Sequence, residues 1–100
     1  MLMTDLVNDY LRNAKPNRFG RQFIADGICV QDQKMYRALK SEGTCVKHLV
    51  DAERKRRVEL AIESGIRDIT TLAKISGSVQ LRRKFHDWYG QCPKQYLRGK

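Results

Sequence analysis

Residues 34–44 read KMYRALKSEGT, and a related stretch, LRRKFHDWYG, occupies residues 81–90. Superposing the two at a separation of 46 residues gives the shared pattern [LM]-x-R-x-[LF], with Arg37 in the first copy and Arg83 in the second. A glycine, Gly43 or Gly90, follows the pattern in each copy, and glycine is the residue that most often closes a helix in the left-handed conformation. The chain therefore contains one helical pattern twice.

The rest of the chain also shows helical spacing of its apolar residues, and no segment alternates with the period of two that a strand needs. Glycine and proline divide the sequence into segments. We expect Thr4 to cap the first helix and Gly43 to close the third one. The sequence predicts an all-α fold of about seven helices, over residues 4–13, 20–26, 31–42, 44–64, 69–76 and 78–89 and after Pro93.

A shorter amphipathic helix that contains an alanine, Ala25 or Ala73, precedes each copy of the pattern. Helix, turn, helix and glycine, repeated, is the arrangement of two helix-turn-helix units. Between them, residues 44–64 have apolar ends around the charged run ERKRR, and as a helix they span roughly 32 Å. We expect this run to be a solvated face. The predicted organisation is a helix-turn-helix subdomain at 1–43, a linker helix at 44–64 and a second such subdomain at 65–100.

The chain has 100 residues and a net charge of +9, which favours a polyanionic partner, nucleic acid before an anionic membrane surface. Residues 65–100 hold eight basic and two acidic side chains and supply most of the excess. Acidic residues interrupt the start of the chain before a signal-type segment can form, and there is no apolar run of about 20 residues. We therefore expect a cytoplasmic protein without a membrane partner.

The outer faces of the two repeated helices carry side chains that suit DNA. Met35 and Leu39 point inward. Gln33 and the residues three, four and seven positions after it therefore share the exposed side. Gln and Arg make bidentate contacts to adenine and guanine edges in the major groove. Val79 takes the place of Gln33 in the second copy. The residues predicted to contact DNA are Gln33, Lys34, Tyr36, Arg37 and Lys40 in the first helix and Gln80, Arg82, Arg83, Lys84 and His86 in the second.

Arg82, Arg83 and Lys84 are consecutive and fan around the helix by about 100° each. At most two of them can enter the groove, so the others are expected to meet phosphates. Arg83, which repeats Arg37, is the stronger candidate for a base contact. We expect Trp88 and the tyrosine after it to pack inside the protein.

These motifs resemble the C-terminal DNA-binding domain of the AraC/XylS family of bacterial transcription regulators, over nearly the whole chain. The stretch IADGICVQDQKMYRALKSEGT has the family's spacing, and HLVDAERKRRVELA is similar to its linker helix. Arg54 stands at that helix's arginine position, which implies that this side chain, unlike the rest of ERKRR, packs or pairs inside. The end of the chain resembles the family's closing motif through Gly90, Pro93, Tyr96 and Arg98. The distance from Ala73 to Leu81 is two residues shorter than the matching distance in the first copy. The resemblance implies a transcription regulator with two recognition helices, and it favours activation.

The family's members often carry a sensing domain, and none is recognisable here. The chain is either a fragment of a larger regulator or a stand-alone member controlled by its own abundance.

Metal binding, cofactor binding and catalysis have little support. Cys29, Cys45 and Cys92 form an odd set without a CxxC pair, as expected of free thiols in a reducing compartment. With His48 and His86 they lack the paired spacing of a zinc site. Cys45 and His48 resemble a nucleophile and a base, but no third group orients them. We expect no metal, no cofactor and no enzymatic activity.

Two functions remain open. The first is a sequence-specific regulator that reads double-stranded DNA with both helices. The second is a helix-turn-helix interaction module that binds RNA polymerase or another regulator and meets DNA only through weak electrostatic attraction.

The two faces differ within one chain, so one monomer should recognise an asymmetric site rather than a palindrome. Major grooves on one face repeat at about 34 Å, close to the length of the linker helix, so two half-sites about 10 base pairs apart are expected. Inserting about 5 base pairs between them should abolish tight binding in a gel-shift titration, because it turns one half-site to the opposite face. A palindromic optimum bound by two chains, or indifference to the insertion, would contradict this expectation.

Overall fold

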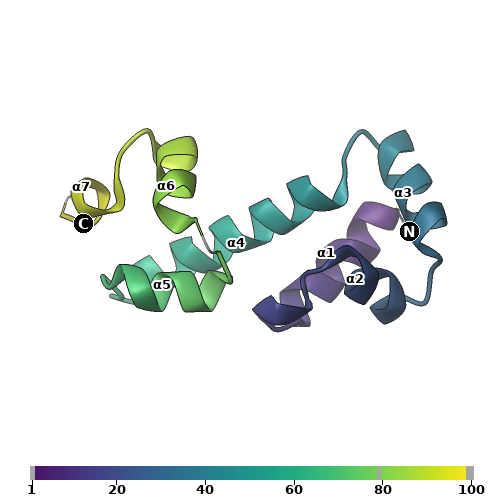
Figure 1. Ribbon diagram of the computed structural model, residues 1–100, viewed down its shortest axis with the longest axis horizontal. Coiled ribbons are helices and arrows are strands. Elements are labelled where there is room, and N and C mark those ends of the chain that lie inside the picture. The colour runs from purple at the N-terminus through teal and green to yellow at the C-terminus, as the bar shows by residue number, and fades with distance from the viewer. Residues whose placement is uncertain (1, 79, 99–100) are drawn as a thin grey trace. The chain divides into compact units, whose positions relative to one another are not determined.

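In the computed structural model, which describes residues 2–78 and 80–98, every regular element is helical (Figure 1). A short 3-10 helix that the sequence did not predict, η1, covers Pro16–Arg18. The seven α-helices of the described residues are α1 (Met3–Asn13), α2 (Arg21–Gly27), α3 (Asp32–Ser41), α4 (Val46–Glu63), α5 (Ile69–Ser76), α6 (Leu81–Tyr89) and α7 (Pro93–Arg98). The predicted all-α fold of about seven helices is confirmed.

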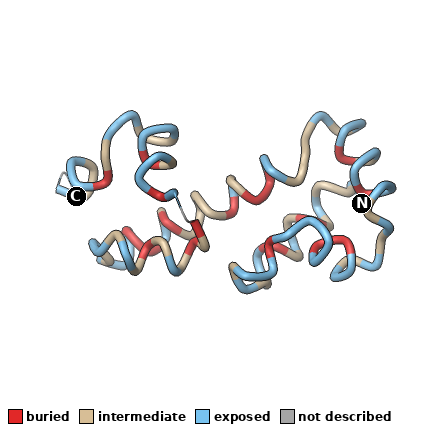
Figure 2. Tube along the Cα trace, in the orientation of Figure 1, coloured by how far each residue is buried: buried red, intermediate tan, exposed pale blue. Residues whose placement is uncertain are grey.

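The chain divides into two compact units, Met1–Glu53 and Arg54–Lys100, and the division falls inside α4. Figure 2 shows buried positions recurring along the helices of each unit. None of the helices within the described ranges combines the length and the apolar character that crossing a membrane requires.

In the first unit, α1, α2 and α3 pack against one another around an apolar core (Figure 1). The buried residues of α1, Val7 and Leu11, and those of α3, Met35 and Leu39, lie four positions apart, as expected of helices that each bury one face. The first half of α4 adds Leu49 and Val50. The buried cluster consists of Val7, Leu11, Phe19, Ile24, Ala25, Met35, Leu39, Leu49 and Val50.

The start of α1 is capped from a distance. The predicted Thr4 cap is wrong, because the helix begins at Met3 and Leu2 occupies the cap position without a side-chain hydrogen bond. Glu42, just after α3, instead accepts hydrogen bonds from the backbone N–H groups of Met3 (2.9 Å) and Thr4 (2.8 Å) and from the Thr4 hydroxyl (2.6 Å). A carboxylate at a helix N-terminus also meets the positive end of the helix dipole. Glu42 therefore ties the start of α1 to the end of α3.

In the second unit, aromatic rings close the core of α6 and α7. The Tyr96 ring of α7 stacks on Tyr89 at 4.1 Å between centroids and meets Phe85 edge-on at 5.6 Å. The Tyr89 hydroxyl donates to the Glu59 carboxylate at 3.2 Å, and burial, more than this carboxylate, raises the pKa of Tyr89. Trp88 and Tyr89 pack against the cluster, as predicted. The buried residues are Val58, Ala61, Ile62, Leu72, Leu81 and Phe85.

The turns of the two units are matched in length, but their second helices are not. Residues 28–31 separate α2 from α3, and residues 77–80 separate α5 from α6, so each connection has four residues. Gly77 ends α5 in the left-handed conformation at φ +70°. Three helical residues precede Met35 in α3, whereas α6 begins at Leu81 itself rather than at the predicted residue 78. Since α5 runs one residue further past Ala73 than α2 runs past Ala25, the net difference between the copies is two residues. The second helix therefore lacks the first turn of the first one.

The Glu42 cap gives a pH-dependent prediction. Hydrogen bonds from Thr4 hold the pKa of Glu42 below its usual value, so the folded carboxylate binds a proton less readily than the unfolded one. Its stabilising effect is complete above the unfolded pKa and is lost as the pH falls through the folded pKa. Urea unfolding should show that Glu42→Gln lowers the free energy of unfolding at pH 7 and that its difference from wild type shrinks in acid.

Glu63→Gln, on the exposed end of α4, is the matched control and should change the free energy of unfolding little. A loss from Glu42→Gln that is constant down to acid pH would show that the charge plays no part.

Candidate nucleic-acid interface

The apolar residues that α3 buries determine which of its residues form the outer face. Met35 is 0% and Leu39 1% exposed, which fixes the rotation of the helix. All five residues predicted to contact DNA are exposed, including Tyr36, which is 46% exposed despite its size. These five are Gln33, Lys34, Tyr36, Arg37 and Lys40. The helix thus presents amide, phenol and cationic groups on one side.

Arg21, the first residue of α2, borders this face and was missed by the sequence analysis. Its guanidinium is paired with the Asp32 carboxylate at the start of α3 and lies 5.2 Å from the centroid of the Tyr36 ring. Such a contact holds the exposed ring in place. A cation at a helix N-terminus interacts unfavourably with the helix dipole. The position of Arg21 in the sequence therefore indicated that an acidic partner such as Asp32 lies nearby.

The outer face of α6 is shorter and more basic. Leu81 and Phe85 are buried, while Arg82, Arg83 and His86 are exposed, as expected. Lys84 is half-buried, unlike the other cations of this helix.

Two further predicted positions of the second copy lie outside α6. Gln80 is exposed, but it precedes the helix at its cap position rather than lying on the helix. Val79 lies outside the described residues. The α6 face therefore rests on three exposed residues and the half-buried Lys84.

The structure brings the predicted residues together in two sets, one in each unit. The α3 set lies within Met1–Glu53 and the α6 set within Arg54–Lys100. Within residues 2–78 and 80–98, no three His, Cys, Asp or Glu side chains gather in a way that could hold a metal ion. Cys29, Cys45 and Cys92 are free thiols, as predicted.

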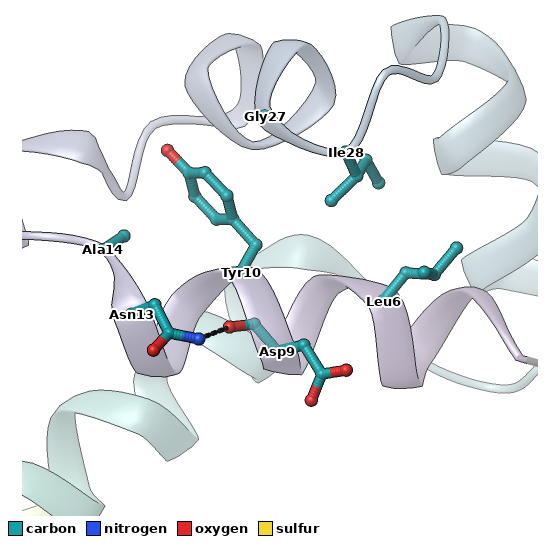
Figure 3. Close-up of a pocket in the computed structure, with 7 residues that line it drawn as sticks. All are labelled: Leu6, Asp9, Tyr10, Asn13, Ala14, Gly27 and Ile28. Atoms are coloured by element: carbon teal, nitrogen blue, oxygen red, sulfur yellow. Dashed lines mark hydrogen bonds between the residues drawn. The ribbon is translucent and has the colours of Figure 1, made fainter.

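A hollow of about 410 Å³ between α1 and the end of α2 is not suited to a nucleic acid (Figure 3). Figure 3 shows the Tyr10 ring pointing from α1 toward Gly27. The Tyr10 hydroxyl donates a hydrogen bond to the Arg18 carbonyl at 2.9 Å. The lining contains the acidic Asp9 and no cationic side chain. An anionic phosphate would be repelled there.

No family model matches the chain, and no curated protein matches it either. Among solved structures, one described as a DNA-binding transcriptional dual regulator from Escherichia coli K-12 superposes on the whole chain. The TM-score is 0.89, and the match covers 100% of this chain and 99% of that one. The chain shares this regulator's fold. At 19% sequence identity, the likeness concerns the fold alone.

Gly27 gives a test of the packing between α1 and α2. A Cβ atom at this position would overlap the Tyr10 ring, so Gly27→Ala should lower the free energy of unfolding by about 1–3 kcal/mol, as overpacking does. In a Tyr10→Ala background the overlap is gone, and the same change should be neutral or stabilising, because alanine favours a helix over glycine.

Urea unfolding of the four proteins in this double-mutant cycle measures the coupling. An equal loss in both backgrounds would show that the strain lies in the backbone and not in the ring contact.

Proposed function

We propose that this chain binds double-stranded DNA sequence-specifically and regulates transcription, with α3 and α6 as its two recognition helices. The observation that carries the proposal is that both copies of one sequence pattern form helices with the same division of faces. In each, an exposed arginine, Arg37 or Arg83, lies opposite a pair of buried apolar residues. An arginine on a helix that can enter the major groove is the commonest reader of guanine.

The α3 face supports base reading in particular. Gln33 and Arg37 lie four residues apart and so share one side of the helix. Tyr36 is exposed between them and is held by Arg21. Lys40 lies one turn further along the helix and is suited to contact a phosphate, because its ammonium group acts as a point charge and lacks the paired donors of a guanidinium.

The fold adds support of a coarser kind. The solved structure that shares it is described as a DNA-binding transcriptional dual regulator, and a net charge of +9 suits a polyanion. Membership of the AraC/XylS family, activation and contact with RNA polymerase are further proposals that rest on the sequence resemblance. We propose a monomer on DNA, in the cytoplasm of a bacterium, because the two reading faces are already present in one chain.

The competing hypothesis is an interaction module that meets DNA through charge alone. Competition with scrambled duplex separates the two. A sequence reader prefers its own site by about 10³-fold or more over bulk DNA, whereas a charge-only binder shows no such preference. The site itself can be obtained by selecting bound duplexes from a random pool.

Arg37→Ala and Arg83→Ala test direct readout. Each should weaken binding to the selected site by about 1–3 kcal/mol and flatten the preference at one base position, because a bidentate contact is lost. The measurement is a titration of the selected duplex and of its single-base variants.

Lys40→Ala is the matched control on the same helix. It should weaken all duplexes alike and lower the slope of log affinity against log salt by about one. An unchanged base preference in both arginine variants would rule out readout by these residues.

A further inference from the structure

A second hollow, of about 550 Å³, lies within the second unit and is lined by cationic side chains from α6, from α7 and from the segment before α5. Arg67 precedes α5, Arg82 lies in the first turn of α6, and Lys94 in the first turn of α7. The three are separated by up to 27 residues in sequence. Only Arg82 belongs to the predicted reading face.

The charge of this hollow is positive even though one acid lines it. Asp68 accepts hydrogen bonds from the Thr70 backbone N–H at 3.2 Å and from the Thr71 hydroxyl at 2.8 Å, so its carboxylate serves as the cap of α5. Three cationic groups and one carboxylate line the hollow, and the charge of Lys74 also acts on that carboxylate, so positive charge is in excess. A bound anion would offset the mutual repulsion of the three cations.

Arg67 is held in place before any ligand binds. Its Nη1 atom donates to the Ile62 carbonyl at 2.7 Å and to the Ile66 carbonyl at 3.3 Å. A guanidinium carries five N–H donors in a rigid fork, so donors remain for an anion. A donor fixed in this way loses little conformational entropy on binding.

We propose that Arg67, Arg82 and Lys94 form a phosphate-binding site, separate from the groups that read bases. Two guanidinium groups and one ammonium suit the several oxygens of a phosphate, and the apolar side chains Ile69 and Leu97 in the same lining suit the carbon atoms of an attached sugar. The phosphate comes either from the duplex backbone or from a free phosphorylated compound. In the first case, which rests on the proposed function, Arg82 contacts backbone and Arg83 contacts bases.

Cys92 provides a reporter, because its half-buried thiol lines the same hollow. In the full chain carrying Cys29→Ser and Cys45→Ser, the rate of Cys92 alkylation by N-ethylmaleimide, a neutral reagent, is measured against inorganic phosphate at constant ionic strength. Phosphate should slow the reaction in a saturable manner. Chloride at the same ionic strength should not.

Lys94→Gln should raise the phosphate concentration needed for protection several-fold, and Arg67→Lys, which keeps the charge but removes the fork, should do the same. Lys15→Gln, which removes the charge of an exposed lysine in the first unit, is the charge-matched control and should leave the midpoint unchanged. Equal effects of the Lys15 and Lys94 variants, or no saturable protection, would overturn the site.

A duplex titration distinguishes the two sources of phosphate. If the backbone supplies it, Lys94→Gln weakens all duplexes alike and lowers the salt slope by about one. If a free compound supplies it, inorganic phosphate still protects Cys92 while the duplex affinity of Lys94→Gln equals that of wild type. Protection by phosphate in a chain that binds no duplex would refute the proposed function and leave the site standing.

Discussion

Helix α4 supplies apolar side chains to both cores, and the positions of the two candidate recognition helices depend on it. A piece of about 50 residues buries a small core, and every contributed side chain is a large share of it. Leu49 and Val50 belong to the cluster that contains Met35 of α3. Val58, together with Ala61 and Ile62, belongs to the cluster that contains Phe85 of α6. Neither unit has a complete core without its half of this helix.

Burial also decides which side chains reach the solvent. Successive residues on a helix are about 100° apart, so turning α3 by one position would carry Arg37 toward the core and expose Met35. Burying a guanidinium without partners costs several kcal/mol, and exposing an apolar side chain forfeits its burial free energy. The same argument fixes α6 through Leu81 and Phe85, which are 3% and 0% exposed. The outward direction of the arginines is thus a consequence of the apolar pattern.

The same reasoning explains which features the sequence could predict. The apolar periodicity and the positions of the glycines were sufficient to predict the seven helices, including both ends of α5, and the exposed face of α3. These features depend on residues within four positions of one another. Glu42 caps Met3 and Thr4, from which it is separated by 39 and 38 positions in the sequence, so no local pattern indicates this cap. The run ERKRR was expected to be a solvated face, with Arg54 alone packed or paired inside. Glu53 is in fact only 6% exposed, and all four basic residues are half-buried, because long side chains can bury their stems while the charge stays near water. The hollow around Arg67 also needed three elements to be placed together.

The distribution of charge assigns different physical tasks to the two units. Residues 1–53 hold eight basic and seven acidic side chains, whereas residues 54–100 hold twelve basic and four acidic ones. Long-range attraction to a phosphate backbone grows with net charge and is screened by salt, so under the proposed function it comes chiefly from the second unit. The first unit, nearly neutral, offers Gln33 and a fixed Tyr36 beside Arg37. Hydrogen bonds and apolar contacts to base edges act only at short range, so that unit is suited to discrimination between sequences once the second has brought the chain to DNA.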